Sequence, residues 1–206
     1  MSGDTALRRL IEGNARYRAN QTHMRDYGAD RAKRVGLHRP LAVLLSCADA
    51  RVGPEFLFDT GPGDLFVVRV AGNIADDDGL ASMEYAVRFL GAPLVFVLGH
   101  SQCGAVDAAI KVMNENAVLP GLLPGLIAKI KPAVATAQAS RPASLLDAAI
   151  AENVRQSMRK INETRPILSE GIAGGSQAQR RRLRHRHRCG DHDLAAVARE
   201  VVPIRC

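Results

Sequence analysis

Three short apolar runs in the first half of the chain constrain the fold more than any other feature of the sequence. They are Leu41–Ser46, Leu65–Val70 and Pro93–Leu98, and the stretches between them carry apolar residues at helical spacing. Runs that are apolar on both faces are typical of strands buried in a parallel sheet. Strands that alternate with helices predict an α/β fold, with a central, mainly parallel β-sheet flanked by helices.

Residues with metal-binding chemistry directly follow two of these runs. Cys47-Ala-Asp-Ala-Arg follows the first run, and His100-Ser-Gln-Cys103-Gly follows the third. The carboxyl ends of parallel strands meet at one edge of a sheet, where open α/β sheets place their ligands. Two thiolates and an imidazole are a zinc ligand set, and three protein ligands leave one coordination position free for catalysis. We therefore predict a zinc site formed by Cys47, His100 and Cys103.

Asp49 and Arg51 form a second candidate pair, in the same loop as Cys47. An isolated surface ion pair contributes little to stability. Here the loop also carries a predicted ligand, so the carboxylate must lie close to the metal. Two roles are open: Asp49 can take the fourth position on the metal and close the site, or, held by Arg51, it can orient a zinc-bound hydroxide by accepting its hydrogen bond.

The remaining stretches predict mostly helices. Leu7, Leu10 and Tyr17 recur at helical spacing near the N-terminus, and the polar stretch Arg18–Arg39 is expected to form an extended arm. Further predicted elements are a short helix over Val52–Phe58, a polar loop over Asp76–Gly79 that leads into a helix ending near Leu90, and helices over Gly104–Asn114, Leu122–Ala137 and Leu145–Ile161.

Composition narrows the class of protein. The chain has 206 residues, of which 47% are hydrophobic, and this is enough for one domain with its own core. No apolar stretch reaches the roughly 18 residues of a membrane helix, and the N-terminus lacks an export signal, so we expect a cytoplasmic protein with no membrane partner. Four Cys in such a chain favour metal binding or free thiols over disulfides. The absence of Trp argues against a nucleic-acid partner.

The positive charge is concentrated near the C-terminal end. Residues 174–206 contain eight Arg and three acidic residues, so they carry +5 of the net charge of +7. The tract 179–188 has no apolar period. We predict a zinc domain over residues 1–173, with an N-terminal helix and arm over 1–39, followed by a disordered Arg/His-rich tail over 174–206.

Several motifs together make the chain similar to the β-class carbonic anhydrases of bacterial and plant type. The matching motifs are, in the family's order, Leu10-x-x-Gly-Asn14, Cys47-x-Asp-x-Arg51, Arg69-x-Ala-Gly-Asn73, Ser82-Met-Glu-Tyr85-Ala, Gly99-His100-Ser-x-Cys103-Gly104 and Glu152-Asn-Val154. The resemblance covers roughly residues 6–170.

The resemblance implies a zinc-dependent lyase that interconverts CO₂ with bicarbonate and a proton, with one Zn²⁺ in each subunit. It implies that Cys47, His100 and Cys103 are the zinc ligands and that Asp49 and Arg51 are the orienting dyad. It also implies a homodimer or tetramer in which the N-terminal helices embrace the partner subunit.

The resemblance also implies three residues of the substrate pocket. Phe66 and Tyr85 match aromatic residues that line the family's pocket near the subunit interface. His38 stands where plant-type members have Gln. Its imidazole can donate a hydrogen bond to the substrate, shuttle protons or simply lie at the interface.

The tail departs from the family pattern. The family continues past Gly171 with a Lys-Leu-containing strand, then Gly-Ala-Val-Tyr-Asp-x-x-Thr-Gly and a final strand, and the written frame has no such segment. Codons that encode residues 176–192 can spell that segment when they are read from the second base, so we hypothesise a frameshift from about residue 174 onward. Without this strand we expect a sheet edge to be left unpaired.

Two other functions stay open at this point. The same fold can hydrolyse another cumulated molecule, such as carbon disulfide or carbonyl sulfide. Alternatively, the chain is a catalytically weak zinc protein that binds polyanions through its basic tail.

Overall fold

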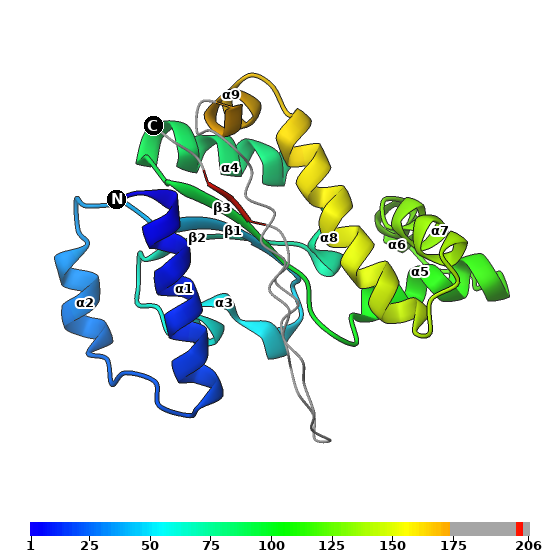
Figure 1. Ribbon diagram of the computed structural model, residues 1–206, viewed down its shortest axis with the longest axis horizontal. Helices are drawn as coiled ribbons and strands as arrows, with labels where there is room; N and C mark the ends of the chain where they lie inside the picture. Colours follow the sequence, from blue (N-terminus) through cyan, green and yellow to red (C-terminus); the bar gives the residue numbers. More distant parts are fainter. Residues whose placement is uncertain (174–200, 204–206) are drawn as a thin grey trace.

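The computed structural model describes residues 1–173 and 201–203 and contains a parallel sheet between two layers of helices (Figure 1). Its parallel strands are β1 (Ala42–Ser46), β2 (Leu65–Arg69) and β3 (Leu94–Leu98). β1 is central and pairs with β2 on one side and with β3 on the other. All residues of β1 and β3 are buried, whereas β2 is partly exposed at the edge. The α/β architecture predicted from the apolar runs is confirmed.

Two hydrophobic cores lie on opposite faces of the sheet. The helices that contribute to the first core are α1 (Gly3–Arg18), α3 (Pro54–Leu57), α5 (Gly104–Glu115), α6 (Leu123–Ala128) and α7 (Lys131–Ala139), those that contribute to the second are α4 (Asp77–Leu90) and α9 (Ile167–Ala173), and α8 (Leu145–Glu163) contributes to both. Successive residues of a strand point to opposite faces, so Leu44 joins the first core and Val43 the second.

Helix α1 packs against the core of its own chain. Ser2 caps the helix by accepting a hydrogen bond from the Thr5 N–H, and Leu10 is fully buried in the first core. Gly13 lies so close to the turn after α3 that an added Cβ would be 1.9 Å from the Phe58 carbonyl oxygen. Helix α1 covers part of the sheet of its own subunit, and the embrace of a partner by the N-terminal helices, which the family resemblance implies, stays a prediction.

Three local expectations need correction. The predicted extended arm contains a helix, α2 (Tyr27–Lys33), which is capped by Asp26 and has no buried residue, so the sequence carries no apolar signal for it. The stretch predicted as one helix over Leu122–Ala137 forms two, α6 and α7, because Pro132 cannot donate a hydrogen bond within a continuous helix. Helix α4 begins inside the predicted polar loop, since Asp76 caps it.

A short strand from the tail, β4 (Val201–Pro203), pairs antiparallel with Leu94–Phe96 of β3. This pairing corrects the expectation of an unpaired sheet edge at those positions, because a strand of different sequence can satisfy the same backbone groups. The basic tract 179–188 and the expected disorder around it lie outside the described residues. Among the helices that the structure describes, none is long and apolar enough to cross a membrane.

Candidate metal centre

The two ligand-bearing loops converge at the carboxyl ends of β1 and β3. Cys47 directly follows β1, His100 lies two residues after β3, and Cys103 is the residue that precedes α5. All three side chains are buried, and their donor atoms lie within 4.8 Å of one another. The two sulfur atoms are 4.0 Å apart. The structure therefore brings together the three residues that the sequence predicted as ligands.

The chemistry of this donor set fits a zinc ion. His100 Nδ1 lies 3.0 Å from the Ser101 carbonyl oxygen, which favours a proton on Nδ1 and a lone pair on Nε2. The buried Nε2 atom has no hydrogen-bond partner in the described part of the chain. The hydrogen bond between the two sulfurs lowers the pKa of Cys47 and raises that of Cys103, so the pair retains one proton that a dication would displace.

Asp49 and Arg51 form a bidentate pair beside this group. Arg51 donates from Nε to Oδ1 at 2.9 Å and from Nη2 to Oδ2 at 2.7 Å, and its backbone N–H also donates to Oδ1. These hydrogen bonds hold the pKa of Asp49 well below its usual range, so the carboxylate stays ionised and can only accept hydrogen bonds. Arg51 Nη2 also approaches the Gln102 carbonyl oxygen, at 3.5 Å, and so connects the two ligand loops.

Comparisons with known proteins agree with this geometry. A carbonic anhydrase family model matches residues 42–178. A carbonic anhydrase of Mycolicibacterium smegmatis is 37% identical over 174 residues, which span 84% of each chain. The chain belongs to the β-class carbonic anhydrase family. Its Cys–His–Cys group is typical of the zinc site of that family, and the protein is a carbonic anhydrase, or carbonate dehydratase.

Solved structures of β-class carbonic anhydrases have the same fold. The β-carbonic anhydrase CcaA superposes with a TM-score of 0.62 at 28% identity, covering 83% of this chain and 79% of that one. A β-carbonic anhydrase from Sordaria macrospora, described as tetrameric, has a TM-score of 0.62 at 24% identity and covers 77% of this chain and 80% of that one.

Arg69 and Gly72 support the ligand loop of this carbonic anhydrase, and sequence reasoning had assigned neither a role. Arg69 donates from Nε to the Cys47 carbonyl oxygen at 2.9 Å and from Nη2 to the Asp49 carbonyl oxygen at 2.6 Å. The Gly72 N–H donates to Cys47 Sγ at 3.3 Å. Arg69 ends the strand beside β1, in register with Ser46, but the sequence alone does not say which strands are neighbours.

The three predicted pocket residues form a cluster that is separate from the metal ligands of the same chain. The ring centroids of His38 and Phe66 are 6.1 Å apart, those of Phe66 and Tyr85 are 6.5 Å apart, and Phe89 extends the row. Phe66 pairs with Val43, four residues before the first ligand, which is roughly 13 Å along a strand. The cluster thus lies beside the edge strand β2.

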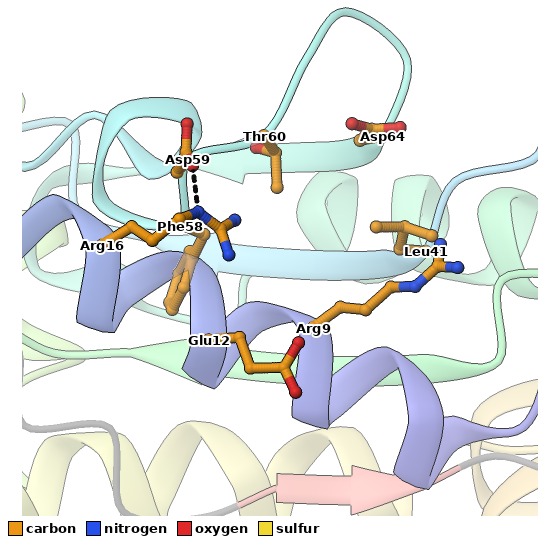
Figure 2. A pocket seen from close by; sticks show the side chains of 8 residues that line it. All are labelled: Arg9, Glu12, Arg16, Leu41, Phe58, Asp59, Thr60 and Asp64. Carbon is orange, nitrogen blue, oxygen red and sulfur yellow. Dashed lines mark hydrogen bonds and ion pairs between the residues drawn. The ribbon is translucent and has the colours of Figure 1, made fainter. Parts of the chain in front are cut away.

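A cavity of about 260 Å³ lies beneath α1, and none of the predicted site residues lines it. Figure 2 shows the Arg16 side chain reaching Asp59 across this region, with Arg9 and Glu12 on the same helix. The Asp59 carboxylate is buried and accepts a hydrogen bond from Arg16 Nε at 2.5 Å. The Arg25 guanidinium and the His23 backbone N–H also contact Asp59. Asp59 therefore fastens the N-terminal arm to the body of the enzyme.

Proposed function

We propose that this protein catalyses the reversible hydration of CO₂ to bicarbonate and a proton, with Cys47, His100 and Cys103 holding a zinc ion. One observation carries the proposal: the buried Cys–His–Cys group lies beside a carboxylate that an arginine fork keeps ionised. In a structural zinc site four protein ligands fill the coordination sphere, so an ionised carboxylate beside it serves no purpose. A hydration site, in contrast, needs a hydrogen-bond acceptor that orients the nucleophile.

The metal supplies Lewis acidity when it is bound, because Zn²⁺ brings the pKa of a coordinated water close to neutrality and so makes a nucleophile for CO₂. The ligand residues set the charge around it. Cys47 and Cys103, both deprotonated, balance the two charges of the ion, and neutral His100 leaves the centre with no net charge. Their burial keeps bulk water away from the ligand atoms.

Asp49 orients the nucleophile in this proposal, and it does not act as a base. Its low pKa means that the carboxylate is ionised throughout the neutral range, so it accepts a hydrogen bond from an O–H group and cannot donate one. Accepting that bond turns the lone pair of the attacking oxygen toward CO₂. Arg51 holds the carboxylate in one orientation through both of its oxygens, which limits the arrangements open to the reacting atoms.

We further propose that a second copy of the chain covers the edge of β2. Three observations support this: β2 has one neighbouring strand in the described part of the chain, Tyr85 and Phe89 are 52% and 72% exposed, and they continue the row from His38 and Phe66. Large exposed aromatic side chains that adjoin an open strand edge are typical of an interface. The His38–Phe66–Tyr85 cluster of one subunit would then line the substrate pocket of the other.

Two variants separate metal binding from catalysis. Cys47→Ser should lose zinc and CO₂ hydration together, because a ligand is removed. Asp49→Asn keeps the shape of the side chain, so it should retain one zinc per subunit while kcat falls at least about tenfold. Stopped-flow CO₂ hydration with zinc analysis of each protein gives both readouts. A folded, zinc-loaded wild type without hydration activity would overturn the proposed function, and an unchanged kcat in Asp49→Asn would overturn the role of the dyad.

A further inference from the structure

A single glycine connects the metal centre to a distant helix. The Gly72 N–H donates to Cys47 Sγ at 3.3 Å, while the Gly72 carbonyl oxygen accepts a hydrogen bond of 2.6 Å from Asn153 Nδ2. Asn153 belongs to α8 and is 81 residues away from Gly72 in the sequence. Asn153 is therefore linked to the sulfur of Cys47 by two hydrogen bonds, with Gly72 as the one residue between them.

The turn around Gly72 is a conformation that the chain would not hold by itself. Gly72 has φ +73° and ψ +18°, and Asn73 follows with φ +43°, so two successive residues lie in the left-handed region. A Cβ on Gly72 would be 2.7 Å from Ile130 Cδ1. A left-handed backbone conformation is kept where contacts with the surrounding structure hold it. The direction of the Gly72 N–H therefore depends on the contacts that hold this turn.

Helix α8 supplies both side chains that anchor this turn. Asn153 bonds the Gly72 carbonyl oxygen, and Ser157, one helical turn later, bonds the Asn73 carbonyl oxygen at 2.9 Å. Both anchors are buried, at 1% and 4% exposure. The two anchors differ in one respect. Asn153 holds Gly72, which donates a hydrogen bond to the ligand Cys47. Ser157 holds Asn73, and no hydrogen bond in the described part of the chain joins Asn73 to a ligand.

The environment of Asn153 indicates that its bond to Gly72 matters more than its contribution to packing. Its Oδ1 atom is buried and has no hydrogen-bond partner in the residues that the structure describes. A buried acceptor without a partner destabilises the folded state, so an apolar residue of similar volume would suit the helix better. The Nδ2 donor to Gly72 is what an apolar residue could not provide.

We propose that Asn153 is a positioning residue of the metal centre, which acts by holding the Gly72 N–H against the sulfur of Cys47. A hydrogen bond to a ligand sulfur draws charge from it, and partners of this kind orient the ligand and tune the metal. This inference rests on the proposed function only in so far as Cys47 binds the metal, and it is testable without the hydration reaction.

The test compares Asn153→Leu with Ser157→Ala in the full chain, because each removes one buried bond from α8 to the turn. Substitution of Co²⁺ for zinc gives sulfur-to-cobalt charge-transfer bands, and competition with a chelator gives the zinc Kd. Asn153→Leu should move these bands to lower energy, since the sulfur becomes more electron-rich, and should raise the Kd for zinc about 10- to 100-fold. Ser157→Ala should leave both values within about twofold of wild type.

Two results would overturn this inference alone. One is a cobalt spectrum and zinc Kd in Asn153→Leu that match wild type, and the other is an equal change in Ser157→Ala, which would indicate general loosening of the turn. If Asn153→Leu does not fold, Asn153→Ser serves in its place, because a serine hydroxyl is too short to reach the Gly72 carbonyl oxygen. A wild-type chain that binds neither zinc nor cobalt would overturn this inference and the proposed function together, which distinguishes that failure from the other two.

Discussion

Replacing Gly72 with Ala should be unusually destabilising for a change of one methyl group, and Gly91→Ala is its matched control. Both glycines have positive φ, +73° and +64°. An added Cβ at Gly91 meets nothing within 4 Å, whereas at Gly72 it would lie 2.7 Å from Ile130 Cδ1 and 3.2 Å from Ala105 Cβ. The two variants therefore share the backbone strain but differ in the clash.

The magnitudes follow from these two contributions. An Ala in the left-handed region costs about 1–2 kcal/mol, which is the whole effect expected for Gly91→Ala. Overpacking a filled site adds about 1–3 kcal/mol, so Gly72→Ala should lower the free energy of unfolding by about 2–5 kcal/mol. Urea denaturation of the metal-free proteins, followed by circular dichroism, measures both values.

The metal provides a second readout for the same pair of variants. Gly72→Ala moves the N–H that donates to Cys47 Sγ, so the Kd for zinc should rise, while Gly91→Ala at the end of α4 should leave it unchanged. Equal losses of stability in the two variants, together with equal zinc affinities, would refute the reasoning about the turn.

Two further predictions concern the arm and the subunit interface. Burial opposes ionisation of Asp59, but the hydrogen bonds from Arg16 and from the His23 N–H lower its pKa below the ordinary value. The resulting stabilisation is present above the unfolded pKa of about 4 and is lost as the pH falls through the folded pKa. Asp59→Asn should therefore be less stable than wild type at pH 7, with a gap that narrows below about pH 4; a gap independent of pH in urea titrations would contradict this. Phe89→Glu places a charge in the exposed aromatic row and should shift the protein toward monomer in sedimentation velocity; an unchanged oligomer would exclude this surface as the interface.

The sequence predicts the sheet and the metal ligands because both depend on short-range patterns. A run that is apolar on both faces has few alternatives to a buried strand, and parallel strands end at the same edge of a sheet, so Cys47, His100 and Cys103 are expected at one edge. The paired geometry of Asp49 and Arg51 is also local, since only one residue separates them in one loop.

The supporting contacts were not predictable because they depend on long-range register. Asn153 bonds Gly72 across 81 residues, and nothing in either local sequence states which carbonyl the side chain meets. Helix α2 was missed for a different reason: none of its residues is buried, so it has no apolar stripe for the sequence to reveal. The position of Phe66 in the edge strand, away from the ligands, likewise follows from the pairing of β2 with β1.

The most direct test of the central claim is CO₂ hydration by the full-length chain before and after removal of its metal. We predict activity in the zinc-loaded protein, loss of activity on chelation, and recovery when one equivalent of zinc per subunit is added back. Circular dichroism of each sample shows whether the fold persists through the cycle. A folded protein whose hydration rate equals the uncatalysed rate with zinc bound, or whose activity survives complete zinc removal, would contradict the account.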